Sequence, residues 1–166
     1  MTGFKSKGII TKAVLVTAFG VFSFTSLADS RFTDNGDGTV TDHQLNLMWS
    51  KADNQGDINW DDALKWVKFN LYYLLPGNKY DDWRMPTIDE LKSLFVDDKT
   101  QEGQLTDCGM RVKVAAQIRL SCGWIWSSES KDISANVFTY RLGYSFSDLK
   151  MHQKAHRAIA VRDIKK

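Results

Sequence analysis

The first 28 residues decide how much of the chain is left to fold, because they have the composition of an export signal. Three lysines and no acid occupy residues 1–12, and an uncharged, largely apolar run follows from Ala13 to Ala28. The run ends in the small residues Ser26-Leu27-Ala28, which suit a signal-peptide cleavage site. A membrane span needs about 20 apolar residues, and hydroxyl residues interrupt this run. We therefore expect cleavage after residue 28 rather than an uncleaved anchor.

Cleavage would leave residues 29–166 as one domain, secreted or periplasmic, in a Gram-negative bacterium. Such compartments are oxidising, so the two cysteines, Cys108 and Cys122, are most simply joined in one disulfide. A redox or metal-binding pair is the alternative, but the two cysteines lack a CxxC spacing and a flanking histidine. We expect no membrane contact once the signal is removed.

Two segments have the pattern of amphipathic helices. In the first, Asn59 is a candidate N-cap, and Ala63, Val67, Leu71 and Leu74 recur at helical spacing before Pro76-Gly77-Asn78 ends the segment.

A capping box predicts the start of the second helix. Thr87 and Glu90 stand in the T-x-x-E spacing in which each side chain hydrogen-bonds the backbone N–H of the other residue. Leu91, Leu94 and Phe95 would form the apolar face of this helix. Pro86 favours an extended approach to the cap.

The remaining segments predict strands. Residues 31–42 have the composition of a hairpin, and the alternative reading as a calcium loop lacks the first ligand and the bidentate carboxylate. A strand is expected at 45–49. After a long connection over 97–123 come three strand-like runs at 124–129, 136–143 and 156–164. This order predicts an α+β fold: a mainly antiparallel sheet, two helices and a long disulfide-tied loop.

Four motifs occur in a specific order: RFTDNGDGTVTD with LMW, then DDWRMPTIDELKSL, then WIWSSE, then AVRDI. Over residues 31–164 the chain resembles the Lcl C-terminal domain family, which is named for a collagen-like bacterial adhesin. The segment WRMPTIDEL also resembles part of the formylglycine-generating enzymes, which implies a C-type-lectin-like fold. These motifs contain the residues to which we assign a structural role: Trp49, Trp83, Arg84, Pro86, Thr87, Glu90, Trp126 and Arg162.

No constellation of catalytic residues is visible, and we expect neither a cofactor nor a metal. His152 and His156 stand four residues apart, as in some zinc sites, but no cysteine or carboxylate cluster completes such a site. A formylglycine-type oxidase would need two reactive thiols, and Cys108 and Cys122 do not match its motif. We therefore predict that the protein is not an enzyme.

Charge is strongly polarised along the sequence. Removal of the three signal lysines changes the net charge from +2 to −1, and residues 29–107 are then net −8 while residues 108–166 are net +7. One interpretation is a site for sulfated or acidic polysaccharide; the other is that the two halves, or two copies in a homo-oligomer, neutralise each other. Export argues against nucleic acid. The candidate anion-binding residues are Arg111, Lys113, Arg119, Lys150, Lys154 and Arg157.

The sequence thus predicts an exported bacterial binding module for adhesion or for glycan and polyanion binding. The resemblance implies the same, because the family's adhesin member resembles a binder of sulfated glycans. The alternative is a protein-interaction accessory subunit of an envelope assembly.

Overall fold

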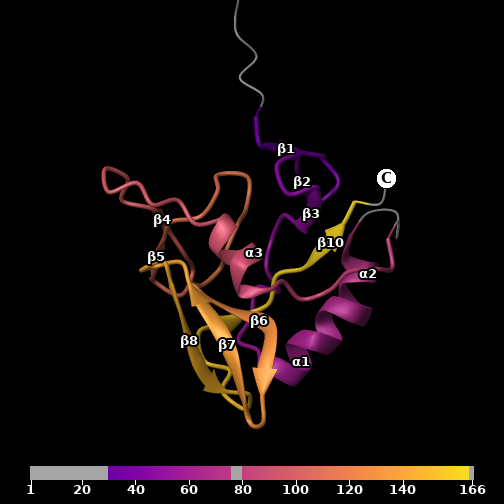
Figure 1. Cartoon of the computed structure of the whole chain (residues 1–166), viewed down its shortest axis with the longest axis vertical. Coiled ribbons are helices and arrows are strands. Elements are labelled where there is room, and N and C mark those ends of the chain that lie inside the picture. The colour runs from indigo at the N-terminus through magenta and orange to yellow at the C-terminus, as the bar shows by residue number, and fades with distance from the viewer. Residues whose placement is uncertain (1–29, 76–79, 165–166) are drawn as a thin grey trace, which may run out of the picture.

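The computed structural model describes residues 30–75 and 80–164. The expected export signal and the Pro76-Gly77-Asn78 helix stop lie outside these residues. The predicted α+β fold is confirmed, with strands predominating and two helical segments (Figure 1). Within the described ranges, no helix is both long enough and apolar enough to cross a membrane.

The predicted N-terminal hairpin forms part of a four-stranded antiparallel sheet. Asp34 and Asp37 accept backbone N–H bonds from Gly36 (3.0 Å) and Thr39 (3.1 Å), so these carboxylates stabilise the turn. The sheet has the order β1-β2-β3-β10, and its strands are β1 (Phe32–Asp34), β2 (Thr39–Asp42), β3 (Leu47–Ser50) and β10 (Val161–Asp163).

The first helical segment begins as predicted, with the Asn59 side chain accepting from the Asp62 N–H at 2.9 Å. It continues without interruption through α1 (Trp60–Lys65), a π-helical turn η1 (Trp66–Asn70) and α2 (Leu71–Leu74). Ala63, Val67 and Leu71 are buried as expected. Leu74 was expected in the same stripe, but 65% of its surface is exposed.

The second helix, α3 (Ile88–Ser93), carries the complete capping box. The Thr87 hydroxyl accepts from the Glu90 N–H at 3.2 Å, and the Glu90 carboxylate accepts from the Thr87 N–H at 2.8 Å. Leu91 and Leu94 are buried as predicted, and Phe95 is partly buried against the same core, but the helix ends at Ser93, before both Leu94 and Phe95.

A second four-stranded sheet has the order β8-β7-β6-β9 and contains β6 (Trp124–Lys131), β7 (Ser134–Thr139), β8 (Tyr144–Leu149) and β9 (His156–Arg157). Strand β8 was not predicted. The run expected at 136–143 is wrong at its end, because residues 140–143 form the β7–β8 turn. Gly143 has φ +76° there, and a Cβ on it would lie 2.4 Å from the Phe95 ring.

The strand expected at 156–164 is also wrong, because its two ends belong to different sheets. Strand β9 pairs in parallel with β6, whereas β10 pairs antiparallel with β3. Between them the chain bonds the end of β3 and the loop after it: Ala160 N–H donates to the Ser50 hydroxyl at 3.0 Å, and Ala158 N–H donates to the Asn54 side chain at 2.8 Å. These residues therefore join the two sheets.

The long connection over 97–123 holds a short hairpin of β4 (Gln104–Leu105) and β5 (Arg111–Val112). The predicted disulfide between Cys108 and Cys122 is present, with an S–S distance of 2.08 Å. It leaves no free thiol in the chain, so the pair of reactive thiols that a formylglycine-type oxidase would need is absent.

Neighbouring residues of one strand contribute to different hydrophobic clusters. Ile125 and Phe138 pack in the cluster that contains Leu91 of α3, while Trp126 and Val137 pack in the cluster that contains Val67 of the helical segment. This follows from the alternation of side chains along a strand. Strands β6 and β7 thus form a layer with apolar contacts on both faces.

Candidate functional site

A basic groove lies where the β4–β5 hairpin meets the β7–β8 turn. The backbone sets this meeting, since Lys113 N–H donates to the Tyr140 carbonyl at 2.9 Å. The contact brings Arg111 and Lys113, both predicted to bind anions, next to Arg141, which the sequence analysis did not select. The groove is lined by Glu102, Leu105, Gly109, Met110, Arg111, Lys113, Arg141 and Leu142.

The three cations of the groove differ in how strongly the protein holds them. The Arg111 guanidinium lies 3.5 Å from the exposed Glu102 carboxylate, which is a weak surface pair. Lys113 Nζ donates to the Asp98 carbonyl at 2.9 Å and has no carboxylate within ion-pair distance in the described ranges. Arg141 is exposed and makes no ion pair there. The groove can therefore offer positive charge to an anion.

A second depression, which we call the tryptophan pocket, shares the lining residue Met110 with the groove. Its volume is about 610 Å³. It contains Lys154, a further predicted anion-binding residue. The pocket is lined by Met110, Trp124, Asp148, Met151, His152, Gln153, Lys154, Ala155 and His156.

Asp148 in this pocket lies between two imidazoles. Its Oδ1 is 2.7 Å from His152 Nδ1, and its Oδ2 is 3.2 Å from His156 Nε2. His156 is buried, lies flat against Trp126 with ring centroids 4.3 Å apart, and donates from Nδ1 to the Lys154 carbonyl at 3.0 Å. Neutral His156 would therefore have its Nε2 lone pair facing the carboxylate, and this nitrogen has no well-directed hydrogen bond.

Acidification is expected to destabilise the fold through His156. Burial lowers the pKa of His156 below its ordinary value, so the unfolded chain binds this proton first as the pH falls. The contribution to the free energy of unfolding is complete above the ordinary pKa of about 6.5 and declines below it. Denaturant titrations at about pH 8 and about pH 5.5 would measure the decline. His156→Gln should reduce the decline, and the control His43→Gln, at an exposed histidine outside this cluster, should not. Equal declines in both variants would contradict the assignment.

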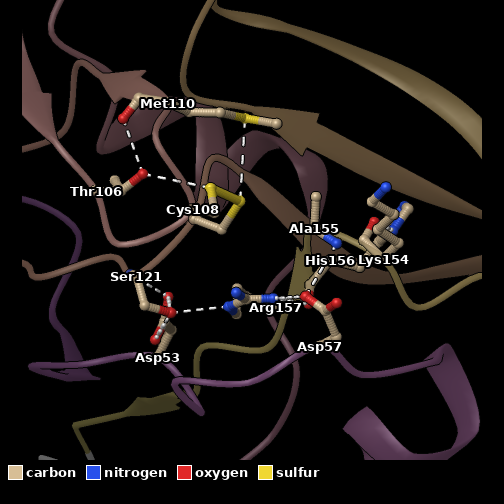
Figure 2. The surroundings of a disulfide bond; sticks show 11 residues. Asp53, Asp57, Thr106, Cys108, Met110, Ser121, Lys154, Ala155, His156 and Arg157 are labelled. Carbon is tan, nitrogen blue, oxygen red and sulfur yellow. Dashed lines mark hydrogen bonds and ion pairs between the residues drawn. A yellow bond between two sulfur atoms is a disulfide. The ribbon is translucent and has the colours of Figure 1, made fainter.

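The disulfide holds the loop that carries Met110. The Thr106 hydroxyl donates to the Met110 carbonyl at 2.8 Å and lies 3.4 Å from Cys108 Sγ, while Cys122 Sγ is 4.0 Å from Met110 Sδ (Figure 2). Met110 lines both the groove and the tryptophan pocket, so the disulfide helps to place both.

Arg157, also predicted to bind anions, is buried and already paired. Its guanidinium donates to Asp57 Oδ1 at 2.6 Å and to the Ser121 hydroxyl at 2.8 Å. Ser121 in turn binds the buried Asp53 through its N–H and hydroxyl, which forms the chain of contacts in Figure 2. Arg157 therefore links strand β9 to the segment that contains Asp57 and to the segment that contains Ser121.

Two more predicted residues lie away from both depressions. Lys150 Nζ donates to the Asp132 carbonyl at 2.9 Å and lies 4.4 Å from the centre of the Trp60 ring. Arg119 lines a different depression together with Lys51. The structure thus places Arg111 and Lys113 in the groove and Lys154 in the tryptophan pocket, whereas Arg119, Lys150 and Arg157 line neither depression.

Ion pairs between the acidic half, residues 29–107, and the basic half, residues 108–166, neutralise part of the charge that is separated along the sequence. The Arg157–Asp57, Arg162–Asp82 and Arg111–Glu102 pairs each join the two halves. Local neutralisation, the second interpretation of the sequence charge, therefore applies to these arginines. It does not apply to Arg141 and Lys154, for which no ion pair is found in the described part of the chain.

The motif residues occupy structural positions. Trp49, Trp83 and Trp126 are buried. Arg84 donates to both Glu90 oxygens at 2.8 and 2.7 Å, which ties the approach to α3 onto its capping residue. The Pro86 carbonyl accepts from Ser128 N–H at 2.8 Å. Arg162 pairs with Asp82 at 2.6 Å and lies over the Tyr80 ring.

A metal-binding cluster of three or more histidine, cysteine or acidic residues is not found among residues 30–75 and 80–164.

Comparison with known families gives one result. The model of the Lcl C-terminal domain matches residues 38–162, which include the groove, the tryptophan pocket and the disulfide. No curated protein matches the chain.

Proposed function

The chain belongs to the Lcl C-terminal domain family, and from that premise we propose that it is an exported, non-catalytic module that binds acidic polysaccharide through the basic groove. The observation that carries this proposal is the meeting of Arg111, Lys113 and Arg141 from two separate hairpins around one depression. A C-type-lectin-like arrangement of the two sheets is part of the proposal. Adhesion to a glycan-bearing surface is the role that it would serve.

The charge of the groove supports an anionic ligand. Arg111, Lys113 and Arg141 line the groove together with a single acidic residue, Glu102. The ion pair between Glu102 and Arg111 is long and exposed, so it neutralises the groove only weakly. Several such contacts act together on a polymer with repeated charges, and salt screens each of them. Binding should therefore be strong at low ionic strength and fall steeply as salt is added.

Heparin affinity chromatography of residues 29–166 tests the proposal. The triple variant Arg111→Ala/Lys113→Ala/Arg141→Ala should elute at clearly lower salt. The affinity loss should lie between about threefold and about a hundredfold, because each of the three exposed charge contacts contributes about 0.2–1 kcal/mol. The matched control removes three cations outside the groove: Lys65→Ala/Lys92→Ala/Lys131→Ala. A native protein that flows through at low salt, or two triple variants that weaken retention equally, would overturn the proposal.

A further inference from the structure

Apolar side chains stand among the cations of this face. Leu105, Leu142 and Met151 are 68%, 62% and 77% exposed, which places them among the most exposed large hydrophobic residues of the described chain. Leu105 and Leu142 line the basic groove, and Met151 lines the tryptophan pocket. Exposed apolar groups inside a charged depression offer contact area that a ligand can cover. A ligand with charge alone would leave them in water.

Trp124 is held in place inside its pocket. Its ring meets the Phe146 ring edge-on, with centroids 5.6 Å apart, and the His156 ring at 5.4 Å. A half-buried aromatic ring fixed in this way costs little conformational entropy when a ligand packs against it. The pocket is therefore pre-organised.

The two depressions differ in net charge. The groove holds Arg111, Lys113 and Arg141, whereas the tryptophan pocket contains the carboxylate of Asp148, next to His152 and His156. Lys154 adds one cation to the pocket. A sulfate or carboxylate of the ligand is thus favoured in the groove, whereas in the pocket the repulsion by Asp148 offsets the attraction by Lys154. A hydroxyl group, in contrast, can donate a hydrogen bond to Asp148.

We propose that the tryptophan pocket is a subsite for an uncharged, hydroxyl-bearing sugar ring of the polysaccharide whose anionic groups lie in the basic groove. This inference rests on the proposed function and assigns a different part of the ligand to each of the two depressions. The apolar face of the ring packs on Trp124, Met110 and Met151, and its hydroxyls reach Asp148. The pocket volume of about 610 Å³ is in the range of small-molecule sites.

The experiment compares two polyanions by calorimetric titration of residues 29–166. The first is a hyaluronan oligosaccharide, in which anionic glucuronate rings alternate with uncharged N-acetylglucosamine rings, and the second is inorganic polyphosphate. Polyphosphate carries the charge without any ring. Trp124→Ala should weaken oligosaccharide binding by about tenfold, as for a central aromatic contact, and leave polyphosphate binding unchanged. Met151→Gln changes a side chain that is mostly in water, so it should fold normally, and it should weaken only oligosaccharide binding. Trp60→Phe is the matched control, and it should change neither.

The outcomes separate the two proposals. If the native protein binds neither probe, the proposed function fails and the subsite fails with it. If both probes bind and Trp124→Ala and Met151→Gln weaken them equally or not at all, the groove stands and the ring subsite is overturned. Vesicles of phosphatidylglycerol form a third arm. Preferential binding to vesicles that depends on Trp124 would assign the pocket to lipid and overturn the sugar assignment.

Discussion

Replacement of Arg157 by Met should destabilise the fold by about 2–4 kcal/mol, because it removes a buried guanidinium with hydrogen bonds in the interior, while its ion-pair partner Asp57 is half-exposed. The side chain is 8% exposed and bonds Asp57, Ser121 and the His156 carbonyl. Its loss would leave polar groups without partners in the interior. The same variant should leave heparin affinity unchanged at temperatures where it is folded, because Arg157 does not line the groove or the tryptophan pocket.

The destabilisation should be larger at neutral than at acid pH. The hydrogen bond from Arg157 lowers the pKa of Asp57, a contribution to stability that is present above the unfolded pKa and lost as the pH falls. Burial raises the pKa of Asp53, and the charge of Arg157 opposes that rise. Without Arg157, the folded state would hold the Asp53 proton more tightly, so its stability would fall as the pH rises.

Denaturant titrations of the native protein, Arg157→Met and the double variant Arg157→Met/Asp53→Asn test this explanation. The double variant should recover part of the loss, because the amide removes the buried charge that the arginine had stabilised. Lys154→Met is the matched control at an exposed cation nearby. A change of less than about 1 kcal/mol in Arg157→Met, together with a loss of heparin affinity, would restore Arg157 to the binding site.

Local signals in the sequence were sufficient for both helix starts. The Thr87–Glu90 capping box and the Asn59 cap each depend on residues three positions apart, so the pattern and the contact coincide. The hairpin at residues 31–42 is local in the same sense. In contrast, residues 156–164 have the composition of one strand, and only contacts with Ser50 and Asn54, more than 100 residues earlier, divide them between two sheets.

The candidate site shows the same division between local and distant information. Counting charges identified Arg111, Lys113 and Lys154, because clustered cations are visible in the sequence. It also selected Arg157, since a sequence does not show that an arginine is buried against an aspartate 100 residues away. Arg141 was overlooked because it was placed in a strand. Gly143, two residues later, was the available signal that a turn would project Arg141 towards the β5 segment.

Removal of the disulfide should affect both stability and binding. In the chain-entropy model, a loop of about 15 residues contributes roughly 3 kcal/mol to the free energy of unfolding. The Cys108–Cys122 bond closes a loop of this size, with a sequence separation of 14. That loop carries Met110, Arg111 and Lys113, which line the proposed binding face.

The double variant Cys108→Ala/Cys122→Ala separates these two effects if both are measured on the same preparation. Denaturant titration gives the stability loss, and heparin elution at a temperature where the variant remains folded gives the binding loss. We expect lower elution salt, because the freed loop no longer holds Arg111 and Lys113 beside Arg141 before the ligand arrives, and ordering it then weakens binding. The hydrogen bond from Lys113 N–H to Tyr140 remains, so binding should weaken without being abolished. Unchanged elution with a stability loss of about 3 kcal/mol would mean that the β5–β7 contact alone positions the groove.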